Sequence, residues 1–236
     1  FKETLRTREN FDLISRRLLI GSDELTFFYI DGFVKDEVMQ KLMQYFIGLK
    51  GIGTGSDAAE KFADSQVPYV EVDVAYKTND IVTSVLSGAV LMLGSTFGNR
   101  AVVIDARTYP ARSTEEPDND RVVQGAHDGF VETLIFNTAL IRRRIRDPRL
   151  TMHYVNMGGS SRTDVVLCYM DGVADPGYVA FLEKKLKSVT PQSLTLGIQN
   201  LAETLIRKRW YNPFPKVRLL ERPDAAASEL VEGRVI

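Results

Sequence analysis

An internal repeat constrains the fold of this chain more than any other feature of its sequence. The segment LTFFYIDGFVKDEVMQKLMQYF, from residue 25, resembles VVLCYMDGVADPGYVAFLEKKL, from residue 165. At an offset of 140, three residues of the first segment match three of the second: Tyr29, Asp31 and Gly32 match Tyr169, Asp171 and Gly172. A second pair of blocks, from residues 67 and 212, aligns without a gap at an offset of 145. Two blocks in the same order at nearly the same offset predict a duplication.

Each half of the repeat has the pattern of a mixed α/β unit. Alternating and β-branched residues predict strands at 15–21 and 25–30 in the first half, and at 150–158 and 164–170 in the second. A helix follows in each half, with Gly51 as the expected stop of the first and Asp175 as the expected N-cap of the second. A third strand, at 69–76 or 216–221, and a second helix, ending at Gly88 or Gly233, complete each unit.

The buried faces of the first helix in each half can also be predicted. Apolar residues at helical spacing form one stripe in each helix: Val38, Met39, Leu42, Met43 and Phe46, and then Tyr178, Val179, Leu182 and Leu186.

The two units are joined by a segment of different composition. Residues 108–128 combine two prolines, an acidic cluster and a glycine, which is typical of a linker. We therefore expect an N-terminal α/β subdomain at 1–107, a linker at 108–128 and a C-terminal α/β subdomain at 129–236. The matching strand of the second half begins only at the last residues, so we expect this subdomain to be truncated before a further domain. The alternative to duplication is that two independent α/β units share this general pattern.

A basic run ends the helix that is expected after the linker. Arg142, Arg143, Arg144 and Arg146 lie in its last turn, where cations interact favourably with the helix dipole. The run allows three interpretations: a docked helix with a solvated end, a contact with another subunit or with a membrane surface, or a nucleic-acid contact. The net charge of −1 and the isoelectric point near 6.2 argue against nucleic acid as a partner.

No set of residues with a catalytic or metal-binding pattern stands out. The one cysteine, Cys168, lies in an apolar strand pattern, and the two histidines, His127 and His153, are far apart. The acidic run of the linker lacks the alternating ligands of a calcium loop. It comprises Glu115, Glu116, Asp118 and Asp120. We expect neither an enzyme nor a metal or cofactor, and we expect these carboxylates to pair with the arginines between subunits.

The text from residue 105 to 150, DARTYPARSTEEPDNDRVVQGAHDGFVETLIFNTALIRRRIRDPRL, resembles the signature of the GerA-type spore germination proteins. Further similar stretches are RRLLIG, FYIDGFVKDE, VVLCYMDGVADP and WYNPFPKVRLLERPDAAASELVEGRVI, so that the resemblance covers nearly the whole chain. The chain departs from the family at His127, where an arginine is usual. We therefore include His127 among the candidate contact residues.

The resemblance implies a function that the composition alone does not reveal. Members of this family are integral proteins of the spore inner membrane, with a soluble N-terminal region and a helical membrane domain. This chain is expected to be that N-terminal region, on the cytoplasmic (spore core) side, in a homo-oligomeric germination complex with other subunits. Its work would be subunit assembly or coupling to an ion channel and ion release. The alternative is a small-molecule (germinant) binding module that closes between two α/β lobes.

Overall fold

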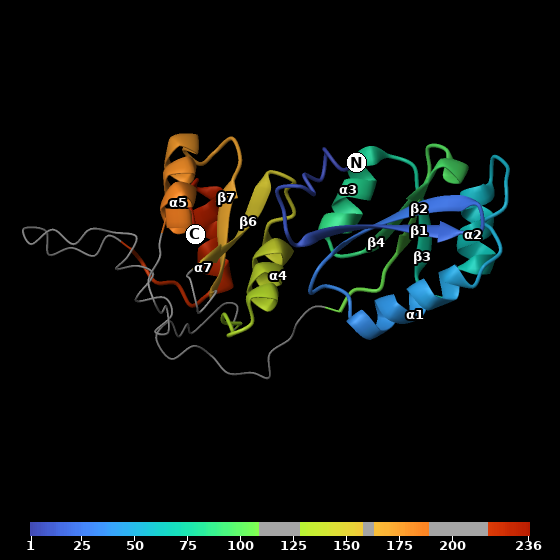
Figure 1. Cartoon of the computed structure of the whole chain (residues 1–236), viewed down its shortest axis with the longest axis horizontal. Helices are drawn as coiled ribbons and strands as arrows, with labels where there is room; N and C mark the ends of the chain where they lie inside the picture. The colour runs from blue at the N-terminus through green and yellow to red at the C-terminus, as the bar shows by residue number, and fades with distance from the viewer. Residues whose placement is uncertain (109–127, 158–162, 189–216) are drawn as a thin grey trace, which may run out of the picture. The chain divides into compact units, whose positions relative to one another are not determined.

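The computed structural model of the chain (Figure 1) describes residues 1–108, 128–157, 163–188 and 217–236. The chain divides into two compact units. The first consists of Phe1–Ala111 and Thr138–Pro148, and the second of Arg112–Asn137 and Arg149–Ile236. Each unit has its own sheet and its own hydrophobic core. The mixed α/β fold expected from the sequence is confirmed.

The first unit contains an antiparallel five-stranded sheet with the order β1-β2-β4-β5-β3. Its strands are β1 (Leu13–Ile20), β2 (Asp23–Ile30), β3 (Val72–Ala75), β4 (Val90–Gly94) and β5 (Ala101–Ile104). A tight turn joins β1 to β2, in the register that pairs Ile20 with Asp23. Gly21 has a φ of 61° there, and a Cβ atom at this position would lie 2.1 Å from the carbonyl oxygen of Lys50. The turn therefore requires glycine.

Helices cover both faces of this sheet (Figure 1). They are α1 (Asp36–Ile47), α2 (Ala58–Gln66) and α3 (Thr78–Leu86), with a short 3-10 helix, η1 (Ser95–Phe97). Successive residues of a strand point to opposite faces, so Phe27 packs in the core of α1 and α2 and Phe28 in the core of α3. This double burial explains the run of consecutive apolar residues in β2. Helix α1 buries four residues of its predicted stripe, Met39, Leu42, Met43 and Phe46, whereas Val38 is half-buried. The helix ends at Ile47 with Gly48 as its C-cap, so the stop predicted at Gly51 is wrong.

The second unit contains the hairpin of β6 (Leu150–Met157) and β7 (Thr163–Met170), with α5 (Pro176–Ser188) and α7 (Pro223–Val231). The backbone N–H of Tyr178 donates to Asp175 Oδ1 at 2.8 Å, so Asp175 caps α5 as predicted. Val179 and Leu186 are buried, but Tyr178 is 51% exposed, which corrects its place in the predicted stripe. The strand predicted at 216–221 is also wrong, because residues 217–221 form no strand.

Chain pairing in the second unit repeats a detail of the first. Cys168 of β7 and Ile236 exchange two backbone hydrogen bonds, with N–O distances of 2.6 and 2.9 Å. In the first unit Phe28 of β2 pairs with Leu91 of β4. Cys168 follows Phe28 by 140 residues, and Ile236 follows Leu91 by 145, which are the two offsets of the sequence repeat. The same register in both units supports a duplication, which stays a proposal.

Helix α4 (Leu134–Arg144) follows the predicted linker, and the division between the two units falls inside it. Its first residues belong to the second unit, and those from Thr138 onward belong to the first. The predicted boundaries at 107 and 129 stay a prediction, since residues 109–127 are outside the described part of the chain. Among the described helices, none combines the length and the apolar character that a membrane span requires.

Candidate functional site

The first of the four predicted arginines is an interior residue. Arg142 has no exposed surface. Its Nε lies 2.9 Å from Asp12 Oδ2, and its Nη2 lies 3.1 Å from Asp12 Oδ1 and 3.2 Å from Asn10 Oδ1. The planar guanidinium thus meets the carboxylate with two parallel hydrogen bonds, a geometry that lysine could not reproduce. All three side chains are buried.

This buried cluster fixes the end of α4 to the start of the first sheet. Asp12 directly precedes β1, and its carbonyl oxygen accepts the N–H of Asp31 at 2.8 Å, at the far end of the β1-β2 hairpin. Ala139, one turn before Arg142, belongs to the core under α3. Arg142 is therefore not available for the subunit or membrane contact that its place in the basic run suggested, because such a contact needs an exposed side chain.

The remaining arginines of the run lie nearer the surface. Arg143 and Arg146 are exposed, and Arg144 is half-buried, with its Nη1 donating to the carbonyl oxygen of Leu140 at 3.0 Å. That bond satisfies one of the carbonyl groups that a helix leaves open in its last turn. The predicted contact with another subunit or a membrane surface therefore concerns Arg143, Arg144 and Arg146, and it stays a prediction.

The acidic partners expected for these arginines cannot be placed. Glu115, Glu116, Asp118 and Asp120 lie outside the described residues, as does His127. The contact between these carboxylates and the arginines therefore stays a prediction.

The beginning of α4 is held by a side chain from within the helix. The helix begins at Leu134. The side chain of Asn137 accepts from the N–H of Val131 at 2.7 Å and donates to its carbonyl oxygen at 2.6 Å. This reciprocal pair fixes the chain that leads into the helix, and the sequence carries no signal for it.

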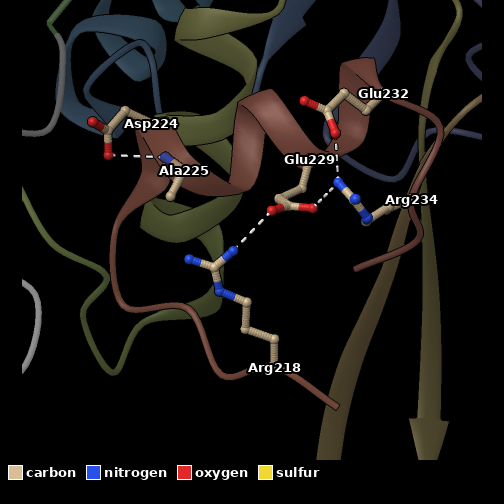
Figure 2. Close-up of polar contacts among 6 residues, drawn as sticks. All are labelled: Arg218, Asp224, Ala225, Glu229, Glu232 and Arg234. Carbon is tan, nitrogen blue, oxygen red and sulfur yellow. Dashed lines mark hydrogen bonds and ion pairs between the residues drawn. The ribbon is translucent and has the colours of Figure 1, made fainter. Parts of the chain in front are cut away.

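An ion network holds the end of the second unit against α7 (Figure 2). Figure 2 shows Glu229 between two arginines: its Oε1 lies 3.1 Å from Arg218 Nη1, and its Oε2 pairs with Arg234. Arg234 also meets Glu232, at 2.6 Å. Both arginine side chains are largely exposed, so solvent screens each pair. The network ties the residues on either side of α7 to the helix and offers no reactive group.

The first unit has an open hollow of about 740 Å³, a volume in the range of small-molecule sites. Its lining includes Glu24, Tyr76, Thr78, Leu93 and Arg100. Arg100 is held there by two neighbours: its Nε lies 2.8 Å from Glu60 Oε1, and its guanidinium carbon lies 5.7 Å from the centroid of the Tyr76 ring. A positioned cation beside hydroxyl and apolar groups can orient a small polar molecule.

The side chains with potential reactivity are either buried or paired with a neighbouring side chain. Cys168 is buried in β7, and His153 Nδ1 lies 3.3 Å from Glu183. The described residues contain no group of His, Cys, Asp and Glu side chains that could hold a metal ion. Burial raises the pKa of Asp31, and the charges of Asp36 and Asp12 raise it further, against the lowering effect of the Gly32 N–H.

Comparison with known proteins gives consistent matches. The sequence pattern of the Bacillus/Clostridium GerA spore germination protein family matches residues 1–236. Stage V sporulation protein AF of Bacillus subtilis (strain 168) is 36% identical over 238 residues, which cover 100% of this chain and 48% of that protein. The uncharacterized membrane protein YfkQ of the same organism is 29% identical over 98% of this chain and 44% of its own length. The chain thus spans about half the length of these relatives.

A solved structure has the same fold. It is the crystal structure of the N-terminal domain of the A subunit of the Bacillus megaterium spore germinant receptor GerK3. The TM-score is 0.71 at 27% sequence identity, and the match covers 99% of this chain and 86% of that one.

Proposed function

Because this chain belongs to the Bacillus/Clostridium GerA spore germination protein family, we propose that it is the non-enzymatic N-terminal domain of a spore membrane protein. Its work is subunit assembly or coupling to an ion channel and ion release during germination. The full-length protein sits in the spore inner membrane, with this domain on the cytoplasmic (spore core) side. Its partners are further copies of itself and other subunits of a germination complex.

One observation carries the coupling part of this proposal. Helix α4 begins in one compact unit and ends in the other, and its last turn is fixed in the first unit by the buried Arg142–Asp12 pair. A helix that contributes residues to both units is a physical route by which a change in one unit can affect the other, and this supports the coupling part of the proposal.

The non-enzymatic part is supported by the use of the reactive side chains. Cys168 packs in the interior, and Glu183 lies beside His153. Catalytic sites bring a nucleophile, a base and an orienting group within hydrogen-bond reach. The burial of Cys168 and the position of Glu183 beside His153 instead fit structural roles for both side chains.

Assembly is tested with the exposed arginines of the α4 end. The variant with Arg143→Glu and Arg146→Glu, placed in the full-length protein, should lower the yield of cross-linked oligomer and slow ion release from spores. A single surface ion pair contributes about 0–1 kcal/mol, so the double reversal is needed for a clear effect. Arg17→Glu is the matched control, because this β1 side chain is 69% exposed and belongs to the same unit. Unchanged assembly and germination in the double variant would refute this contact.

A small-molecule binding module is the second candidate function, and the hollow beside Arg100 favours it. The ligand in that case interacts with the fixed Arg100 guanidinium and the lining hydroxyl groups. A thermal-shift screen with amino acids, sugars and dipicolinate tests it, using Arg100→Gln and, as control, Arg17→Gln. A shift that is lost only in Arg100→Gln supports the module, and no shift with any compound counts against it.

A further inference from the structure

The outward side of α5 carries two large exposed aromatic side chains. Tyr178 is 51% exposed and Phe181 is 53% exposed. Their rings are stacked, with centroids 6.3 Å apart and an interplanar angle of 22°. Aromatic side chains usually contribute their area to a core or an interface, so an exposed stacked pair marks a contact surface.

Lysines surround this aromatic pair. Lys184 and Lys187 are exposed, and the ammonium of Lys185 lies 5.5 Å from the centroid of the Phe181 ring. The single acidic residue of the helix, Glu183, is turned toward His153, and the carboxylate of Asp175 accepts the N–H of Tyr178 at the cap. The outward side of α5 thus combines apolar area with positive charge.

We propose that this face of α5 binds the surface of an anionic phospholipid bilayer. Aromatic rings with one polar edge, such as Tyr178, are stable at the level of the lipid head groups. Lysine side chains extend their ammonium groups toward the phosphates while their methylene stems cover the boundary region. The proposal rests on the membrane location proposed above, and it identifies the surface of the domain that faces the bilayer.

The shape of the face favours a bilayer over an acidic protein. The rings stand on a single helix between long flexible side chains, and a peptide partner usually binds where a groove receives it. Mobile head groups can adjust to the lysines without a fixed pattern of acceptors, and each lysine near an anionic surface contributes to binding. An acidic partner would require its own carboxylates in matching positions.

Vesicle cosedimentation of the 236-residue chain tests the proposal. We expect binding to vesicles of phosphatidylcholine and phosphatidylglycerol in equal parts, and little binding to phosphatidylcholine alone. Lys184→Gln and Lys187→Gln should each weaken the binding about fivefold, an effect that high salt reduces. Tyr178→Ser with Phe181→Ser should also weaken it. Tyr45→Ser is the matched control, because Tyr45 is 42% exposed on α1 and should leave binding unchanged.

Equal binding to both kinds of vesicle, or full binding by the α5 variants, would overturn the proposal. So would binding to soluble polyglutamate without binding to vesicles, which would indicate an acidic protein partner. Thermal unfolding of each variant excludes a folding defect as the cause. The vesicle experiment uses this chain alone, whereas the assembly experiment uses the full-length protein in spores, so that a failure of one is distinguishable from a failure of the other.

Discussion

Arg142 and Asp12, 130 residues apart in the sequence, form an ion pair in the interior of the first unit. Their side chains are 0% and 2% exposed, and Asn10 accepts a further hydrogen bond from the guanidinium. Burying both charges is costly, and only the close geometry and the further hydrogen bonds offset that cost. The pair therefore acts as a specific connection between α4 and the start of β1.

Breaking this pair should be strongly destabilising. Arg142→Met leaves the Asp12 carboxylate buried without its partner, and we expect a loss of about 3–5 kcal/mol in the free energy of unfolding. Asp12→Asn should cause a similar loss, because it leaves the positive charge of Arg142 buried without its carboxylate partner. Urea unfolding of both single variants and of the double variant measures the coupling. A loss below about 1 kcal/mol in Arg142→Met would show that the buried pair does not hold α4.

The turn between β1 and β2 should tolerate glycine alone. Gly21→Ala places a Cβ atom 2.1 Å from the Lys50 carbonyl oxygen and also strains a φ of 61°. Gly98 has the same φ, but a Cβ atom there meets nothing within 4 Å, so Gly98→Ala measures the strain of the backbone alone. Gly98 has a ψ of −122°, outside the left-handed helical region, so we expect Gly98→Ala to cost about 1–3 kcal/mol through backbone strain, and Gly21→Ala clearly more. Equal losses in thermal unfolding would refute the steric part of this explanation.

The pH dependence of stability should contain a contribution from Asp31. Burial, with the charges of Asp36 and Asp12, raises its pKa above the ordinary value of 3.8, so the folded state holds this proton more tightly than the unfolded state. The resulting stabilisation is present below the unfolded pKa and is lost as the pH rises through the folded pKa. Asp31→Asn should therefore gain stability relative to the parent chain at neutral pH.

Urea unfolding at several pH values measures this gain, which should shrink as the pH falls through the raised pKa of Asp31. The pKa of Asp105 is shifted in the opposite direction, because the hydrogen bond from Arg107 lowers it. Its contribution to stability also changes with pH, so Asp31→Asn must be compared with the parent chain at each pH. Asp64→Asn, at an exposed position of α2, is the control for the change in net charge. A gain that stays constant with pH would contradict the assigned cause.

Local patterns in the sequence were sufficient for most helices and strands. The Asp175 cap and the stripe of α1 depend on neighbouring residues, which is why they could be predicted. The strand expected at 216–221 depends on a partner instead. In the first unit β3 is held by β5, where Val72 pairs with Ile104, whereas no described strand of the second unit lies beside residues 217–221. A strand without a partner leaves its backbone groups unsatisfied.

The candidate site was harder to predict for the same reason. Arginines at the end of a helix are usually solvated. Nothing near Arg142 in the sequence indicates that its side chain is buried and hydrogen-bonded to Asp12 and Asn10. Tyr178 was assigned to the buried side because it fits the helical spacing, although the spacing also fits an outward face beside Phe181. Periodicity identifies a stripe but does not specify its edges, and these depend on the elements packed against the helix.

The network at α7 should be weak in comparison with the buried pair. Glu229→Gln removes the charge that meets Arg218 and Arg234 (Figure 2). Because both arginines are largely exposed, we expect a loss of about 1 kcal/mol or less in the free energy of unfolding, and a smaller one at high salt. Glu232→Gln is the matched control: within the described part of the chain Glu232 pairs with Arg234 only, and it is 60% exposed, so the effect should be smaller still. Chemical unfolding at low and high salt separates the two variants. Two outcomes would contradict this prediction: a loss of stability in Glu229→Gln as large as that in Arg142→Met, or a loss that does not change with salt. Either would mean that solvent does not screen the charge of Glu229, although its arginine partners are exposed.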